Sequence, residues 1–351
     1  MEYYMPRLLT RISLMDYLIF LLTSTFLIAE SASFGQSVSA QDEARLGITL
    51  VDDQEFSEGI KHLRKARNLD LTEYEYPFEI GRAFLLWGKA KKAEQYFYPL
   101  IEHADATPEL FVLLADCYRD LGKSKNEKTS LEVGLGKFPS SGMVFSRMGE
   151  MFAANSDGPM ALAYWEKGIE MDPTFPDNYR HAAQFLSSQH DQLWTWLYGQ
   201  TYLNLTVAND HPDVNAMQFV RKSMFRLFNK GKNQPDKKGL DAKVYEVLIP
   251  CSMNGIVANK IIEIEPKMAC FIEAWQKLEG GPSIPVFDHL NLIASMGKMT
   301  EYLFWLYGEA DRTEMNEWGT DNAQNFNEFA TWVYWNGIQL DAENPFNRLR
   351  N

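Results

Sequence analysis

The sequence predicts an all-α protein in which repeated helical hairpins are followed by a second helical domain. Three observations support this: a 34-residue period over residues 41–205, helix-like spacing of apolar residues beyond them, and a hydrophobic share of 46%. That share is large enough for a packed core. The formal net charge of −13, from 34 basic and 47 acidic residues, disfavours nucleic-acid binding because phosphates are neutralised by excess Lys and Arg.

Residues 1–40 have the features of a secretory signal peptide. Arg7 and Arg11 precede an apolar stretch from Ile12 to Ala29, and small or polar residues follow as far as Ala40. The alternative is a retained signal anchor, but Asp16 interrupts the apolar stretch and the rest is shorter than the roughly 20 residues needed to span a bilayer. We therefore expect a cleaved signal and a soluble, exported protein, periplasmic or extracellular, without a stable membrane span.

The 34-residue period is carried by small residues. The first helices of successive units hold Gly47, Gly81, Ala115, Gly149 and Ala183, and the second helices hold Ala93 and Ala161. A small side chain lets the two helices of a hairpin approach closely, and one hairpin cannot bury its apolar face alone, so neighbouring hairpins must stack. We expect about five units over residues 41–205. The last is degenerate, because Thr195 and Gly199 break the pattern, and the segment around Trp194–Trp196 is expected to form a terminal cap.

Turn and cap residues fit the same units. Gly88 and Gly122 fall between paired helices, where glycine ends a helix at little steric cost. Thr107-Pro108-Glu109 predicts a helix start. Pro99 falls in the last turn of a second helix and is expected to shorten it.

On this period the chain resembles the tetratricopeptide-repeat (TPR) superfamily. The resemblance implies a right-handed superhelix of antiparallel helix pairs that binds a protein or peptide in a concave groove and performs no chemistry. The chain also resembles secreted Bacteroidota TPR proteins of uncharacterised function. This second resemblance depends on the export signal and on three C-terminal segments: Trp305-Leu306-Tyr307-Gly308, Phe326-Asn327-Glu328-Phe329 and Trp332.

Counting from the start of each unit, the resemblance also implies which first-helix residues line the groove. These candidates are Glu75, Phe78, Arg82, Glu109, Val112, Asp116, Arg119, Asp120, Ser146, Glu150, Asp177 and Arg180. The Lys and Asn pattern with which chaperone-docking members grip a terminal carboxylate is absent from these positions. The surface leans acidic, so a partner segment with Lys or Arg is expected. The alternative is that the charges only solvate an exposed face.

Residues 206–351 are expected to form a helical C-terminal domain. Apolar spacing predicts a helix from Val214, further helices at 261–278, 286–308 with a break at Gly297, and 313–336, and a short strand or extended link at 243–250. Eight basic residues and two acidic ones lie between Arg221 and Lys243. This stretch either docks an acidic surface, anionic glycan or lipid headgroup, or is a solvated face. Three separate buried thiols are expected, although the sequence leaves open whether Cys251 and Cys270 pair.

No catalytic or metal motif is found. The six histidines form no close metal-binding pair, and there is no nucleophile elbow, Walker loop or dinucleotide fingerprint. We therefore expect no cofactor and no catalysis, and predict a protein-interaction or scaffolding module of the cell envelope with an unidentified protein or peptide partner. The alternative is an enzyme or a small-ligand or glycan-binding protein whose site lies among the dense aromatic residues of the C-terminal half.

Overall fold

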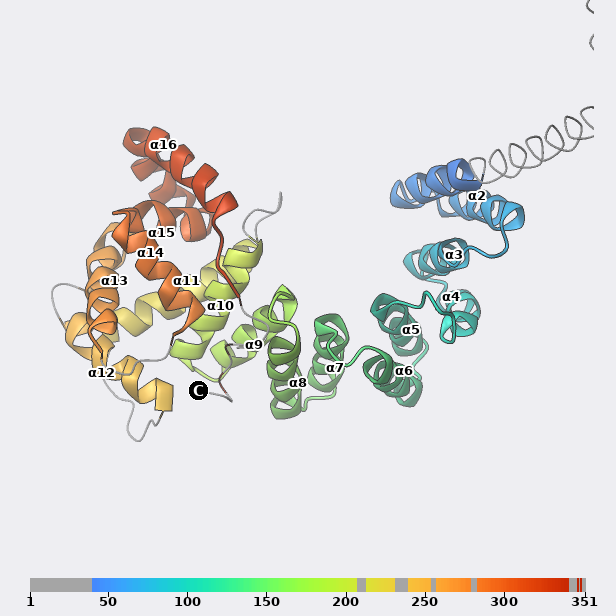
Figure 1. Cartoon of the computed structure of the whole chain (residues 1–351), viewed down its shortest axis with the longest axis horizontal. Coiled ribbons are helices and arrows are strands. Elements are labelled where there is room, and N and C mark those ends of the chain that lie inside the picture. The colour runs from blue at the N-terminus through green and yellow to red at the C-terminus, as the bar shows by residue number, and fades with distance from the viewer. Residues whose placement is uncertain are drawn as a thin grey trace, which may run out of the picture. The chain divides into compact units, whose positions relative to one another are not determined.

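The computed structural model describes residues 40–206, 213–230, 239–253, 257–278, 283–340, 346 and 348 (Figure 1). Across these residues the chain is helical with short turns and contains no strand, which confirms the predicted all-α class. None of the described helices is both long and apolar enough to cross a bilayer. The predicted signal peptide lies outside the described residues, except for Ala40. The chain divides into two compact units, one ending at Glu127 and the other beginning at Lys128.

The first unit contains the early hairpins. Residues 40–52 are helical and are followed by α2 (Phe56–Leu69), α3 (Glu75–Leu86), α4 (Ala90–Phe97), the 3-10 turn η1 (Tyr98–Leu100) and α5 (Pro108–Asp120). Helix α3 packs on α2 and α4, and α4 packs on α5. Helix α6 (Ser124–Lys137) spans the division between the units.

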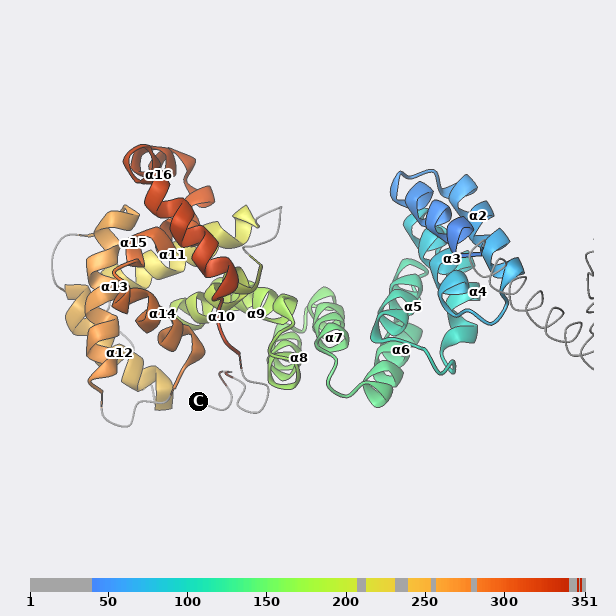
Figure 2. The ribbon, with the colours of Figure 1, turned by 45° about the horizontal axis from the view of Figure 1, so that its top comes forward.

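The second unit continues the hairpins and adds the C-terminal helices. Its elements are α7 (Gly142–Ala154), α8 (Gly158–Met171), α9 (Pro176–Ser188), α10 (Gln192–Thr206), α11 (Val214–Lys230), α12 (Gly239–Met253), α13 (Ile261–Gln276), α14 (Pro285–Ser295), α15 (Met299–Tyr307), η2 (Gly308–Ala310) and α16 (Arg312–Trp335). Helix α7 pairs with α8, and α9 with α10. Helix α16 lies against α15 (Figure 2). The predicted domain boundaries at residues 40 and 205 remain a prediction.

The predicted turns and the predicted helix start at Pro108 are confirmed. Gly88 and Gly122 have φ angles of 70° and 67°, in the left-handed region that favours glycine. Helix α4 gives way to a 3-10 turn just before Pro99. Pro108 is the first residue of α5, and Thr107 before it is extended, although its side chain makes no capping hydrogen bond.

The small residues of the repeats lie where hairpins close. A Cβ atom added to Gly81 would be 2.5 Å from the Phe97 ring, and one added to Gly149 would be 2.2 Å from Trp165 Nε1. Gly47 faces Leu63 in the same way, at 2.8 Å from its Cγ. The alanines at the equivalent places are fully buried: Ala93, Ala115, Ala161 and Ala183. At the three glycines, any larger side chain would push the paired helices apart.

Two predictions for the second unit are wrong. Residues 243–250 form part of helix α12, because Leu240, Val244 and Leu248 recur at helical spacing and are all buried. Helix α10 is a central helix instead of a terminal cap: every residue from Leu193 to Leu203 is buried, between α9, α11 and α14. The helix is buried on every side, including its polar residues Thr195, Gln200 and Thr201.

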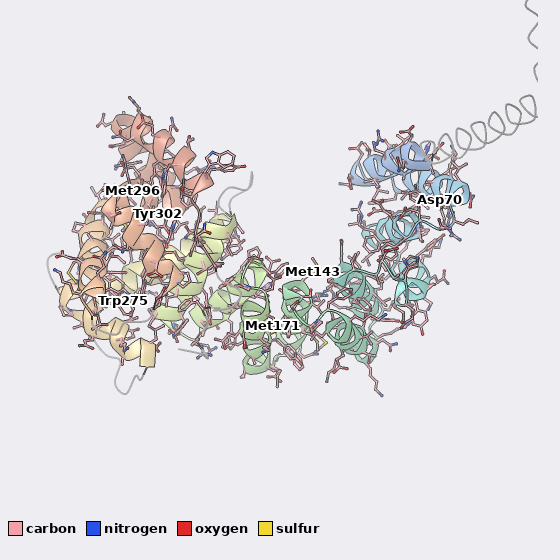
Figure 3. The ribbon with its side chains drawn as sticks, viewed as in Figure 1. Asp70, Met143, Met171, Trp275, Met296 and Tyr302 are labelled. Atoms are coloured by element: carbon pink, nitrogen blue, oxygen red, sulfur yellow. A yellow bond between two sulfur atoms is a disulfide. The ribbon has the colours of Figure 1, made fainter. Side chains whose placement is uncertain are left out.

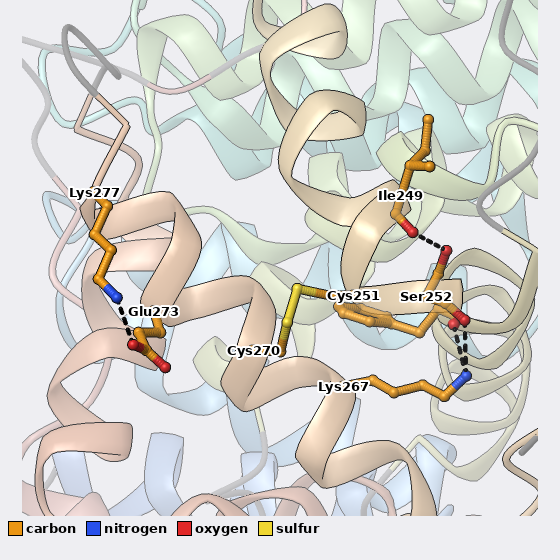
Figure 4. The surroundings of a disulfide bond; sticks show 8 residues. Ile249, Cys251, Ser252, Lys267, Cys270, Glu273 and Lys277 are labelled. Atoms are coloured by element: carbon orange, nitrogen blue, oxygen red, sulfur yellow. Dashed lines mark hydrogen bonds and ion pairs between the residues drawn. A yellow bond between two sulfur atoms is a disulfide. The ribbon is translucent and has the colours of Figure 1, made fainter. Parts of the chain in front are cut away.

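The expectation of three free thiols is also wrong. Cys251 of α12 and Cys270 of α13 form a disulfide, with Cα atoms 5.7 Å apart (Figure 4). Cys117 is free and buried, as expected. Burial raises the pKa of the Cys117 thiol to about 12, so this group stays protonated in the folded protein.

A buried lysine lies next to the disulfide. Lys267 Nζ donates to the main-chain oxygen of Ser252 at 3.0 Å and to that of Phe228 at 3.5 Å (Figure 4). These carbonyls belong to the last turns of α12 and α11, where a cation interacts favourably with the helix dipole. The lysine thus joins the ends of two helices to α13.

Two residues near the C-terminus pack back onto the hairpins of the second unit. The Phe346 ring stacks on Trp194 of α10, with centroids 5.4 Å apart. Arg348 Nε donates to Glu166 Oε1 of α8 at 2.8 Å, and the Glu166 side chain is 1% exposed. Arg348 therefore supplies a charge partner to a buried carboxylate.

Candidate functional site

The candidate residues on α3 are placed in three different environments. Glu75 is exposed. Arg82 Nε donates to Glu79 Oε2 at 2.7 Å, and Arg82 also lies 3.6 Å from Asp52. Phe78 is buried between Tyr74 and Phe97, with ring centroids 5.7 Å from each. Phe78 therefore stabilises the hairpin core and does not line a surface, which corrects its predicted position.

Helix α5 carries a chain of charges. Asp116 lies 3.1 Å from Arg119, and Arg119 lies 3.7 Å from Asp120. Glu109 is exposed in the first turn, and Val112 is half-buried. The face presented by α5 is therefore ionic, with one small apolar side chain.

In the second unit, α7 and α9 share an ionic cluster. Glu150 accepts from Arg147 at 2.7 Å and lies 3.2 Å from His181 Nε2. The His181 ring stacks on Trp165 with centroids 5.3 Å apart. Arg147 could have been found from its i,i+3 spacing to Glu150, but nothing in the sequence indicates that His181 joins the cluster.

The remaining candidates of the second unit differ in exposure. Asp177 is exposed, and Arg180 Nε donates to Asp213 at 3.0 Å. Ser146 is buried, and its carbonyl accepts a hydrogen bond from Trp165 Nε1 at 3.2 Å. Ser146 therefore belongs to the hairpin core and, like Phe78, does not line a groove as predicted.

Three exposed carboxylates recur at the same place in their repeats. Glu75, Glu109 and Asp177 each lie in the first turn of a first helix, where a negative charge stabilises the helix dipole. Within the described residues, none of the three carboxylates forms an ion pair. Each is therefore available to a cation from outside the chain.

The aromatic residues of the C-terminal half pack mainly on one another. The Phe304 and Trp318 rings stack with centroids 4.1 Å apart, and Trp275 meets Phe287 at 4.8 Å. Figure 3 labels Trp275 and Tyr302 among these side chains. Tyr302 is fully buried and accepts hydrogen bonds from Gln200 and Asn204 at 3.0 and 2.8 Å. These rings fill the core of the second unit.

One titrating group in this core gives a pH prediction. Burial beside Tyr302 lowers the pKa of His289 from 6.5 to about 4. In the unfolded chain His289 binds a proton as the pH falls through about 6.5, whereas in the folded chain it stays neutral until about pH 4. Lowering the pH therefore favours the unfolded state and lowers the free energy of unfolding. Between pH 7 and pH 5 this group should lower the free energy of unfolding by about 2 kcal/mol.

Urea denaturation of the wild type and His289→Phe at both pH values measures this effect. The other titrating groups contribute equally to both proteins, so the wild type should lose more stability than the variant. Equal losses in the two proteins would contradict a neutral, buried His289.

Among the described residues, no three His, Cys, Asp or Glu side chains lie close enough together to hold a metal ion. The sequence matches no known protein-family model. It also matches no curated protein.

Several solved structures are similar to part of the chain. The TPR protein TTC0263 of Thermus thermophilus has a TM-score of 0.43 at 14% identity, over 53% of this chain and 99% of that one. PilF of Pseudomonas aeruginosa has a TM-score of 0.42 at 12% identity, over 55% and 92%. MamA of Desulfovibrio magneticus RS-1 has a TM-score of 0.38 at 12% identity, over 49% and 98%. At these scores the likeness carries no argument about function, and the fold assignment depends on the helix pairs themselves.

Proposed function

We propose that this chain is an exported, non-catalytic scaffold of the cell envelope that binds a protein or peptide through the first helices of its repeats. The observation that supports this most is the recurrence of Glu75, Glu109 and Asp177 as exposed carboxylates without an ion pair among the described residues. Because the small residues of the repeats are used for hairpin packing, the charged face of each first helix is left for contacts outside the chain.

The chemistry of this face favours a basic partner segment. Asp120 is exposed beside Arg119, and Glu150, which contacts both Arg147 and His181, keeps 38% of its side chain exposed. Lys or Arg side chains would pair with Glu75 and Glu109 in the first unit and with Asp177 in the second, without first breaking an ion pair among the described residues. Such rim charges affect association rate and specificity more than affinity.

The disulfide supports the proposed location. Disulfides persist in oxidising compartments such as the periplasm and the extracellular space, and are rare in reducing ones. Cys251–Cys270 joins two helices of the second unit and is compatible with a chain that folds after export.

Crosslinking and affinity purification of the full chain from its own envelope tests the proposal. The triple variant Glu75→Lys, Glu109→Lys and Asp177→Lys should lose the protein partners that the wild type recovers. A matched control replaces the exposed acids Asp53, Glu246 and Asp321 by lysine, which changes the net charge equally, and should keep those partners. Recovery of the same partners by both variants would contradict binding at the first helices.

A further inference from the structure

A pocket of about 390 Å³ lies on the second unit between α11 and the segment that precedes α13. Its basic side chains are Arg221, Lys222 and Arg226, all on α11. Its apolar surface comes from Phe225 and from Val257, which is 66% exposed. None of these residues belongs to the first-helix face proposed above.

The pocket walls are held in place by internal contacts. Arg221 forms an ion pair with the buried Glu314, at 2.5 Å from its Oε2, and the Arg221 guanidinium lies 4.8 Å from the centre of the Phe225 ring. Asn229 makes two hydrogen bonds to the main chain of Ala258, at 2.7 and 2.8 Å. The segment at residues 257–259 is thereby fixed against α11, so the pocket is formed before any ligand arrives.

Two of the three basic side chains are not used within the protein. Lys222 and Arg226 are exposed, lie one helical turn apart, and form no ion pair with any described residue. Like charges at this spacing weaken a helix slightly, so the pair has no local benefit. The chain has a net charge of −13, yet these two cations lie together at the pocket, next to its apolar residues Phe225 and Val257.

We propose that this pocket binds a short acidic segment of a partner protein. Two carboxylates of that segment pair with Lys222 and Arg226, and an apolar side chain next to them contacts Phe225 and Val257. The volume is at the lower end of ligand pockets, which suits one or two side chains of a peptide. The exposed Val257 distinguishes this site from one for a bare anion, because an inorganic ion gains nothing from an apolar wall.

Fluorescence titration of the full chain with a labelled hexapeptide of alternating glutamate and leucine tests the proposal. The double variant Lys222→Glu and Arg226→Glu should weaken binding at least about 10-fold, and Val257→Ser should weaken it about threefold. The control Lys167→Glu and Lys277→Glu makes the same charge change at exposed lysines outside the pocket and should bind within about twofold of the wild type. Circular dichroism of each variant verifies that it folds.

Several results would overturn the proposal. They are absence of binding, equal binding of the glutamine–leucine hexapeptide, or equal binding by the Lys222 and Arg226 double variant. Displacement of the peptide by inorganic phosphate at equal concentration would show a site for free anions, and preference for phosphatidylserine vesicles over the peptide would show a membrane site. The first-helix triple variant should bind the hexapeptide unchanged, so failure of this proposal is distinguishable from failure of the scaffold function.

Discussion

Replacing both Cys251 and Cys270 by serine should lower the free energy of unfolding of the second unit by about 3 kcal/mol. The disulfide closes a loop between residues 19 positions apart, and loops of this length give roughly that stabilisation by restricting the unfolded chain. The bond also joins α12 to α13 next to Lys267, so its loss loosens the contact through which that lysine reaches the helix ends.

Urea denaturation with and without a reducing agent measures this effect. The reductant should lower the unfolding midpoint of the wild type and leave that of the double variant unchanged. Thiol labelling supplies a second readout: the wild type unfolded without reductant should expose one reactive thiol, Cys117, and the reduced chain should expose all three. Three reactive thiols before reduction would contradict the disulfide.

Gly149→Val should destabilise the second unit by about 3 kcal/mol. Even a single Cβ at this position would lie 2.2 Å from Trp165 Nε1. The indole cannot move away easily, because it is buried, donates to the Ser146 carbonyl and stacks on His181. Inserting atoms into such packing typically costs about 1–3 kcal/mol, and valine places two more carbons in the contact.

Gly319→Val in α16 is the matched control. Among the described residues, no atom from another part of the chain lies within 4 Å of a Cβ at Gly319, and valine is a better helix former than glycine. The control should therefore unfold at the same temperature as the wild type or slightly above it, whereas Gly149→Val should unfold well below. Similar melting temperatures for both variants would contradict the close hairpin packing.

The helical hairpins are predictable because close helix crossings need small side chains at fixed spacing. Gly81 and Gly149 have this role, and the spacing is visible in the sequence as a multiple of 34 residues. The central position of α10 is harder to predict, because a helix that is buried all round lacks a one-sided apolar pattern. Residues 243–250 alternate loosely between apolar and polar side chains, as in a strand, which explains the wrong prediction of a strand or extended link.

The candidate sites are less predictable than the fold. Counting positions in a repeat assigns a residue to a helix face, but the neighbours decide whether its side chain reaches the surface, and this excludes Phe78 and Ser146. The basic stretch of α11 is visible in the sequence. The pocket beside α11 cannot be seen in the sequence, because it depends on the two hydrogen bonds by which Asn229 fixes the main chain of Ala258. The Cys251–Cys270 pair likewise depends on how α12 meets α13.

The contacts of Phe346 and Arg348 have a practical consequence for handling the protein. Shortening the chain after Leu340 would leave the Trp194 indole without its stacked ring and Glu166 without the guanidinium that faces it. The truncation would then expose aromatic surface and remove one charge partner of the buried Glu166 carboxylate, and both changes favour aggregation. Affinity tags and fluorophores used in the binding assays are therefore better attached to exposed positions of α16 than to the last residues.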